Sequence, residues 1–487
     1  MEFKMKKFMI MLTVFAMFFL VSCGGSSKDE DKTDTGDTTA DTGDTQTDPA
    51  DTGDTNPDPA ATGDTNHDPA DTGDTGTTPD PSDTGDTEEG NWEAKYKKAD
   101  EHAEKVSADV VKANNDLGMK MFSKLAAAEA GKNMMISPLS ISIAMTMMSN
   151  GASGDNIAEM KEVLGFGDME FSDLNAQFAD LIQSLVEADK DLVLEIANSV
   201  WMTDGFAPDV KQDFIDVLTE FYDAAFFTED FQDEATVSKI NSWVSEKTHG
   251  KIDKILENID PQTVMHLINA IYFKAAWTTS FDKDRTREGR FKLSDGTLTT
   301  ANYMGFAPDA EDLEFFSYSY NSWEDGFSVI RIPYGRDVFA FYGIVPNEEN
   351  EINIDDFIAQ IAENGFDHYL SLLTKKEFPI VLPKFKFEYS KSLLEIFNEL
   401  GMEKAFVAGG FDNIAENDLF ISIISHKTFI EVNEEGTEAA AVTDVGADSG
   451  GDEAGFYAIR PFVFVIRDER NGTILFIGKV ENPVYDK

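Results

Sequence analysis

The residues of this chain whose types and spacing suggest chemistry lie in one long loop near the C-terminus. The loop joins two β-like runs, Phe429–Val432 and Phe462–Ile466. Long loops inside a folded domain are uncommon and usually carry function. From Thr437 onward, small or apolar side chains alternate with a face that holds the acidic ones. A flexible loop could show the same alternation by accident. The alternation is nevertheless typical of a strand that has not yet paired, so the chemistry that these residues suggest is main-chain hydrogen bonding to a sheet.

No catalytic constellation accompanies this loop. The sequence lacks a His-Glu-x-x-His metal motif, a Gly-x-Ser-x-Gly nucleophile turn, a phosphate-binding loop and a Cys-x-x-Cys pair. Its six histidines are scattered along the chain, and isolated histidines are more often structural than catalytic. We therefore expect no enzyme, no catalytic residue, no metal and no cofactor.

Motifs in and around the loop resemble those of one family. The loop begins with a run that resembles the hinge of the serpins, inhibitors that trap proteases by loop insertion: Glu434, Glu435, Gly436, Thr437, Glu438, Ala439, Ala440 and Ala441. Further matches follow in the family's order: Ile136–Ile141, Asn150–Gly154, Asn198–Trp201, Leu267–Trp277, Leu382–Phe385, Leu400–Met402, Ser425–Lys427, Pro461–Phe464 and Phe476–Pro483. Each motif is weak alone, but so many in order are specific to this family.

Helices and strands interleave around these motifs without a repeating strand–helix–strand unit. Helical spacing covers Ala108–Ala130, Leu139–Asn150 and Val237–Lys247, the second after the capping pair Ser137-Pro138. Strand patterns cover Leu192–Trp201, Val264–Tyr272, Val329–Ile332, Val338–Val345 and Phe378–Phe387, and Asn471-Gly472 predicts a two-residue hairpin. We expect an α+β fold with mostly antiparallel sheets. The resemblance implies the serpin fold, with three sheets, about eight or nine helices and an exposed reactive-centre loop.

The resemblance also assigns roles to residues outside the loop. In serpins a polar cluster, the shutter, lies beneath the central sheet where strands must part. Its counterparts here are Ser137, Ser140, Asn269 and His426. Buried polar groups at such a place can exchange hydrogen-bond partners between two states. The alternative is that these residues only satisfy one another's hydrogen bonds in the core. Trp277 matches the tryptophan at the breach, the top of the central sheet where insertion begins.

The reactive bond follows from the family's loop length. In a standard serpin loop the scissile bond lies fourteen residues after the hinge glycine, which points to Gly450–Gly451, and counting eleven residues back from Pro461 gives Gly450 again. Glycine offers no side chain to a specificity pocket, so elastase-like or subtilisin-like proteases fit best. Asp448–Ser449 is the alternative bond and would suit an acid-specific protease.

The expected function is irreversible, suicide-substrate inhibition of a serine protease by insertion of the cleaved loop. The expected partner is the protease, held in a covalent acyl complex by a monomeric inhibitor. The alternative is a non-inhibitory serpin that acts as a surface adhesin or an extracytoplasmic chaperone. Against that alternative, the segment Thr437–Thr443 contains no proline and places small residues at its inward positions.

The N-terminal residues predict export and lipid anchoring in a bacterium. Three lysines precede the apolar run Phe8–Val21, which is short for a transmembrane helix. Leu20–Cys23 then resembles a lipoprotein cleavage box, although a plain signal peptide with an incidental cysteine would look similar. We expect a signal peptide over residues 1–22, an acylated Cys23 that binds the membrane, and an outer-membrane or cell-surface location, since Gly24 replaces the aspartate that commonly retains lipoproteins at the inner membrane.

Residues 23–95 should form a tether, and residues 96–487 the serpin domain. The tether repeats Asp-Thr-Gly-Asp-Thr and is too poor in apolar side chains to repay the entropy of folding. Calcium binding by its aspartates remains an alternative, without the spacing of an EF-hand. The net charge of −51 excludes nucleic acid as a partner, because phosphate contacts need clustered lysine and arginine. The single cysteine lies at position 23, so the domain has no disulfide.

Overall fold

The computed structural model describes residues 88–305, 318–322, 326–347, 352–375, 380–437 and 456–485. All of them belong to the second of the two units, Met1–Pro79 and Asp80–Lys487, into which the chain divides. The expected signal peptide, Cys23 and the tether up to residue 87 lie outside the described residues, as do loop residues 438–455.

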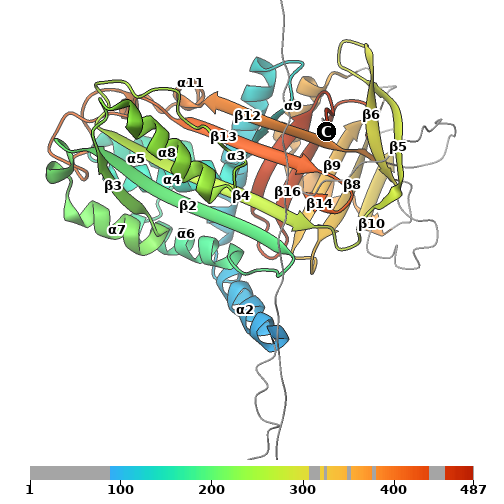
Figure 1. Ribbon diagram of the computed structural model, residues 1–487, viewed down its shortest axis with the longest axis horizontal. Helices are drawn as coiled ribbons and strands as arrows, with labels where there is room; N and C mark the ends of the chain where they lie inside the picture. Colours follow the sequence, from blue (N-terminus) through green and yellow to red (C-terminus); the bar gives the residue numbers. More distant parts are fainter. Residues whose placement is uncertain are drawn as a thin grey trace, which may run out of the picture. The chain divides into compact units, whose positions relative to one another are not determined.

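The strands form three sheets, as expected (Figure 1). In spatial order the six-stranded sheet comprises β12 (Phe385–Ser392), β13 (Ser425–Val432), β14 (Gly436–Thr437), β4 (Met265–Ala276), β2 (Leu192–Thr203) and β3 (Ala225–Glu229). The seven-stranded sheet comprises β1 (Met134–Ile136), β17 (Ile474–Val480), β16 (Phe462–Asp468), β9 (Phe339–Pro346), β8 (Phe327–Tyr334), β7 (Tyr318–Ser322) and β10 (Thr374–Lys375). The four-stranded sheet comprises β15 (Phe456–Tyr457), β11 (Ile380–Pro383), β6 (Leu298–Gly305) and β5 (Asp282–Lys292). Only the pairs β2/β3 and β11/β15 are parallel among the described strands.

Ten α-helices lie within the described residues, and two of them are only six residues long, so the expected cluster of about eight or nine is met. They are α2 (Glu88–Ala103), α3 (Ala108–Ala128), α4 (Pro138–Gly151), α5 (Asp155–Leu164), α6 (Phe171–Leu185), α7 (Gln212–Tyr222), α8 (Glu234–Lys247), α9 (Ile354–Asn364), α10 (Phe366–Ser371) and α11 (Leu394–Glu399). Helix α4 starts where its sequence predicted, because the Ser137 hydroxyl accepts a hydrogen bond from the Ser140 amide and Pro138 occupies the first turn.

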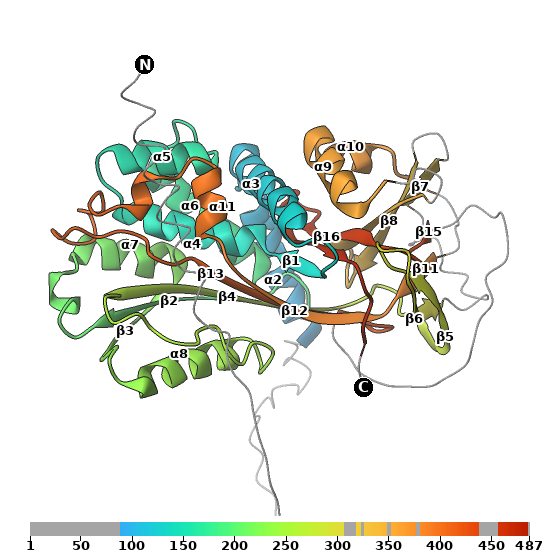
Figure 2. The same ribbon diagram turned by 90° about the horizontal axis from the view of Figure 1, so that it is seen from above.

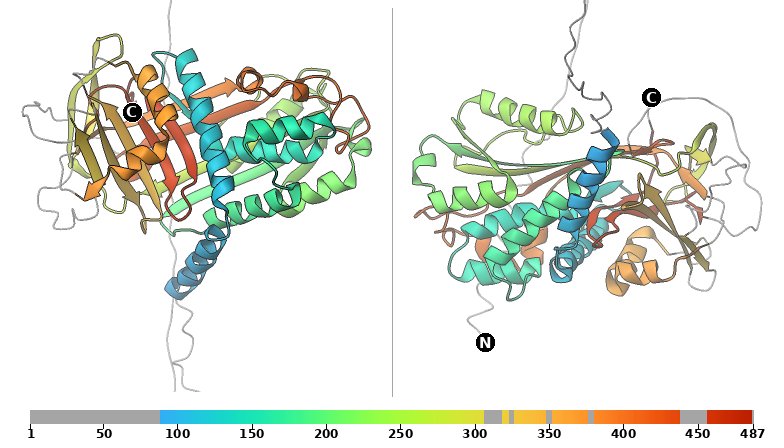
Figure 3. Two further views of the ribbon diagram at one scale, coloured as in Figure 1. Left: turned by 180° about the vertical axis from the view of Figure 1, so that it is seen from behind. Right: turned by 90° about the horizontal axis from the view of Figure 1, so that it is seen from below.

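The helices cover the six-stranded sheet on both faces. Helix α8 lies on one face, where Ile240 and Val244 pack with Trp201 and Ile268 of the sheet (Figure 2). Helices α3 to α7 gather on the opposite face, as the views from behind and from below show (Figure 3). The face under α3 to α7 belongs to the core, whereas the α8 face is covered only in part, because β12 exposes Lys386, Glu388 and Ser390 there.

The expected strand Phe378–Phe387 is wrong as a single element. The structure divides it at Lys384 into β11, in the four-stranded sheet, and β12, in the six-stranded sheet. The amide of Lys384 donates to the carbonyl of Asn302, and its side chain turns to a buried carboxylate of the hinge. The break depends on partners distant in the sequence, so the local apolar pattern could not predict it.

The Asn471-Gly472 hairpin is present, but its two-residue turn is wrong. Strand β16 ends at Asp468 and β17 begins at Ile474, so five residues connect them, and a register shift occurs between Ile466 and Arg467. The amide of Gly472 donates to the carbonyl of Asp468 at 2.9 Å, which closes a wider turn than the dipeptide alone suggests.

Candidate functional site

The hinge residues begin a short strand inside the six-stranded sheet. Strand β14 holds only Gly436 and Thr437 and lies between β13 and β4 (Figure 1). Thr437 pairs with Ala275 of β4 on one side and with Val432 of β13 on the other, antiparallel to both. Within the described part of the chain, β13 and β4 are joined only through these two residues. The described hinge residues therefore occupy the start of a strand position between β13 and β4.

Gly436 is required by the close approach of the hinge to β4. Its φ is +152°, and a Cβ at this position would overlap with the carbonyl oxygen of Ala275. The preceding turn is tight, because the amide of Asn433 donates to the carbonyl of Gly436 at 2.9 Å and the reverse bond is 3.3 Å. The hinge glycine thus lets the chain reverse direction and enter the sheet within four residues.

The two hinge glutamates have different environments. Glu434 is 2% exposed, and its carboxylate contacts the Lys384 ammonium at 2.8 Å and accepts a bond from the Thr286 hydroxyl at 2.6 Å. Removing one partner of such a buried pair typically costs about 3–5 kcal/mol, because the other charge is left unpaired. Glu435 is half-exposed and pairs with Lys283. Glu434 fixes the turn, whereas Glu435 lies at its surface.

Trp277 contacts the same turn. Its backbone amide donates to the carbonyl of Glu435 at 2.9 Å, and its indole N–H donates to the carbonyl of Asn433 at 2.8 Å. The indole stacks on Tyr334 of β8, with ring centroids 4.5 Å apart, and the Tyr334 hydroxyl lies 2.8 Å from the Thr437 hydroxyl oxygen. One aromatic pair therefore holds both the turn and the first inward-facing hinge residue.

The four expected shutter residues form one hydrogen-bond network. The amide of Ser137 donates to Nε2 of His426 at 3.1 Å, and the Ser137 hydroxyl caps the Ser140 amide. The Ser140 hydroxyl donates to the side chain of Asn269, whose amide donates to Asn198 at 2.7 Å. His426 belongs to β13 and Asn269 to β4. Helix α4 therefore bonds to both strands that flank the hinge.

The model of the family described as "Serpin (serine protease inhibitor)" matches residues 112–483 of this chain. The chain belongs to the serpin family. As a family, serpins are described as inhibitors of serine proteases rather than as enzymes.

This chain matches serpin relatives and solved serpin structures over nearly the whole length of each of them. Serpin-Z10 of Arabidopsis thaliana is 32% identical over 390 residues, which is 76% of this chain and 97% of that protein. The native state of the thermophilic serpin tengpin has a TM-score of 0.66 and 32% identity, covering 76% of this chain and 94% of tengpin. Human thyroxine-binding globulin, solved with thyroxine, has a TM-score of 0.68 and 26% identity, covering 77% of this chain and 99% of that one.

The serpin's site includes side chains that the sequence did not single out. Tyr334, Lys384 and Thr286 contact the hinge from three different strands or loops, and Asn198 extends the shutter network. Lys384 and Asn198 lay within motifs already noted, so a search for polar residues inside those motifs would have found them. Tyr334 and Thr286 carried no signal in the sequence. The reactive-bond candidates Gly450, Gly451, Asp448 and Ser449, and hinge residues 438–441, lie outside the described residues.

A cavity of about 240 Å³ lies beside the shutter. Its lining comes from α4, from the part of β4 around His266 and Asn269, and from the start of β13 at His426. It thus lies at the ends of β13 and β4 that are opposite to those paired with β14. Neighbouring apolar side chains on its rim are exposed, including Phe420 and Ile423.

The buried histidines should make the serpin less stable as the pH falls from about 6.5 to about 4. Burial lowers the pKa of both His426 and His266 to about 4. In this window the unfolded chain binds protons that the folded chain does not, so each histidine removes up to about 1.4 kcal/mol per pH unit, with no effect above its unfolded pKa. The denaturant midpoint should therefore fall less steeply with decreasing pH for His426→Gln than for the parent. An equally steep fall in both proteins would mean that His426 does not take up a proton on unfolding.

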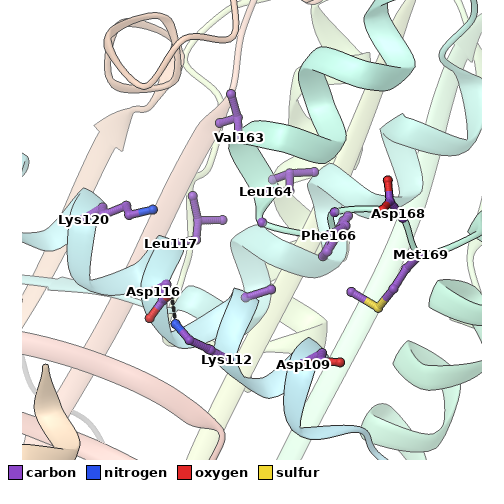
Figure 4. Close-up of a pocket in the computed structure, with 13 residues that line it drawn as sticks. Asp109, Lys112, Asp116, Leu117, Lys120, Val163, Leu164, Phe166, Asp168 and Met169 are labelled. Atoms are coloured by element: carbon purple, nitrogen blue, oxygen red, sulfur yellow. Dashed lines mark hydrogen bonds and ion pairs between the residues drawn. The ribbon is translucent and has the colours of Figure 1, made fainter.

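A wider pocket of about 550 Å³ lies between α3 and the loop that follows α5 (Figure 4). Leu117 and Phe166 form apolar walls, and Lys112, which bonds to Asp116, lies on the rim. None of the predicted site residues lines it. Across the described ranges, no group of three metal-ligating side chains occurs, and no helix has the length and hydropathy to cross a membrane.

Proposed function

We propose that this serpin is an irreversible, suicide-substrate inhibitor of serine proteases, with elastase-like or subtilisin-like enzymes as its preferred targets. The proposal rests mainly on β14, in which Thr437 already pairs with both β13 and β4 and Gly436 with β4, at one end of a strand position that no other described residue occupies. The small side chains of the next hinge residues, Ala439 and Ala441, suit continuation of that strand, because they add little volume to a packed core.

The reaction begins as ordinary proteolysis. The protease serine attacks the carbonyl carbon of Gly450, an ester forms, and the bond to the nitrogen of Gly451 breaks. The protease histidine, which took the serine proton, gives it to the departing amine. The loop N-terminal to the ester then inserts before water reaches it, carrying the protease along and distorting its active site.

The register of β14 predicts where the inserting residues would pair. Thr437 is opposite Ala275 and Val432. Moving six residues along all three strands brings Thr443 opposite Asn269 (275 − 6) and His426 (432 − 6). Thr443 shares the inward parity of Thr437, so its hydroxyl would enter the shutter network, where it could exchange hydrogen bonds with Asn269 and His426.

Mixing the serpin with elastase-like and subtilisin-like proteases tests this proposal. We expect an SDS-stable band with the mass of the protease plus the serpin's large fragment, and a released fragment that starts at Gly451. A start at Ser449 would instead assign the bond to Asp448. A serpin that is cut without a covalent complex, while the protease stays active, would be non-inhibitory, which is the adhesin or chaperone alternative.

We also propose that the protein is exported and held at the outer membrane or cell surface through acylated Cys23, as a monomer on its tether. Two or more acyl chains give stable anchoring, whereas one gives only marginal binding. The variant Cys23→Ser should therefore appear in the soluble fraction and inhibit as well as the parent, because the reactive loop is distant in sequence. Retention of this variant in the membrane fraction would refute lipid anchoring at this residue.

A further inference from the structure

Helix α2 lies outside the part of the chain that the family model covers, since it ends at Ala103 and the match begins at residue 112. It nevertheless packs on the domain. Ala99 and Ala103 are buried, His102 contacts Asp180 of α6 at 2.6 Å, and Lys95 contacts Glu187 at 2.6 Å. Figure 3 shows α2 as a separate rod beside the helix cluster. These contacts with α6 and the segment after it would suffice to dock the helix.

A second set of α2 contacts reaches a different element, the turn between β8 and β9. Both carboxylate oxygens of Asp100 bond to the guanidinium of Arg336, at 2.6 and 3.2 Å. The ring of Tyr96 lies under the same guanidinium, 4.6 Å from its centre. Such bidentate, stacked arginine contacts are strong and directional. Arg336 is further fixed by the carbonyl of Ala188 at 2.8 Å.

Arg336 is the third residue of a continuous segment that touches the hinge. Its first residue, Tyr334, stacks on Trp277 and bonds to Thr437. Its second, Gly335, donates its amide to the carbonyl of Ala276, the last residue of β4, at 2.9 Å, and accepts from the Thr278 hydroxyl at 2.8 Å. The turn Tyr334–Arg336 thus joins α2 directly to the hinge and to the end of β4.

We infer that α2 is a clasp that positions the turn Tyr334–Arg336 against the hinge and thereby slows insertion of the loop before a protease cuts it. The inference rests on the proposed insertion mechanism. Deeper insertion extends the separation of β13 and β4 beyond the two residues of β14, and the end of β4 is tied to the turn through Ala276 and through the Trp277–Tyr334 stack. A turn held by α2 resists that movement, whereas a released turn follows it.

Asp100 can be altered with little change elsewhere. Asp100→Asn keeps the size of the side chain and removes its charge. Arg470, the other partner of Asp100, retains its pair with Asp468 at 2.7 Å. Arg336→Gln removes the same contact from the other side. If both act through one contact, the double variant should behave like either single variant, because coupled residues are not additive.

His102→Asn is the matched control. It removes a contact of α2 with α6 but leaves Asp100 and Tyr96 on Arg336. If α2 only added stability to the domain, all three single variants would change amide exchange and inhibitory lifetime to the same extent. A clasp on the turn gives a response for Asp100→Asn and Arg336→Gln that His102→Asn does not share.

Amide hydrogen exchange in the uncut, full-length protein is the first readout. The amides of Trp277, Thr278 and Gly335 are bonded across the turn and hinge. We expect them to exchange about tenfold faster in Asp100→Asn and Arg336→Gln, as expected from losing one charge-assisted pair, and at the parent rate in His102→Asn. Equal exchange in all four proteins, or an equal increase in the control, would overturn the clasp.

The second readout is the time for which the uncut serpin remains able to inhibit at physiological temperature. Asp100→Asn should lose this ability about tenfold faster than the parent, as its loop inserts unprovoked. If the parent never inhibits, the proposed function fails, while the exchange experiment still decides whether α2 restrains the turn. If exchange rises but the inhibitory lifetime does not change, the turn does not control insertion and the inference is wrong.

Discussion

Replacing Thr437 by arginine is expected to turn the inhibitor into a substrate that its protease cleaves to completion. Thr437 is 4% exposed, pairs with strands on both sides and bonds to Tyr334. An arginine here would place an unpaired guanidinium in the sheet, which costs at least several kcal/mol. Because Thr437 is already seated before cleavage, the variant should lose its hinge contacts in the resting protein as well as the ability to insert.

The measurement is the stoichiometry of inhibition, with covalent complex followed on a denaturing gel. The arginine variant should be cut at the parental bond, leave the protease active and form no complex. Thr437→Ser is the matched control, since it keeps the hydroxyl that faces Tyr334 and should inhibit like the parent. Parental stoichiometry in Thr437→Arg would mean that inhibition does not proceed by loop insertion.

The hinge shows what local sequence predicts and what it does not. Alternation of small residues predicted an unpaired strand with Thr437 on the inward face. Thr437 is buried, but it is already paired with β13 and β4. The same alternation gave no reason to expect that Glu434 would be buried. Its partner Lys384 lies far away in the sequence, and that ion pair also explains why the strand expected over Phe378–Phe387 is broken. Periodicity reports which face is inward, but it carries no information on long-range partners.

The shutter residues were predictable partly from local sequence and partly from the family resemblance. Ser137 was predictable as a helix cap from its own neighbours, and the cap is observed. Asn269 and His426 came only from the family resemblance, because an isolated polar residue in a strand has no local signature. The structure connects them through α4 and adds Asn198. Contacts that cross between a helix and two strands depend on tertiary packing, which no single segment of the sequence encodes.

Cleavage of the loop near Gly450 should make the serpin more stable, which is the reverse of ordinary nicking. Insertion would pair backbone groups along both β13 and β4 and bury the inward face that continues from Thr437. Roughly ten additional backbone hydrogen bonds at about 1 kcal/mol each would contribute about 10 kcal/mol. The entropy of unfolding grows with the number of residues, and for a domain of this length this stabilisation should raise the melting temperature by about 10–20 °C.

Thermal melts of the intact and the cleaved serpin check this expectation, and Thr437→Arg supplies the control. The cleaved variant has the same broken bond but cannot seat its first inward residue, so its melting temperature should stay near that of the uncut variant. A higher melting temperature after cleavage in both proteins would mean that the cut itself, and not insertion of the loop, causes the stabilisation. No gain in the parent would mean that the gap between β13 and β4 does not accept the loop, and the strand position that β14 begins would then need another explanation.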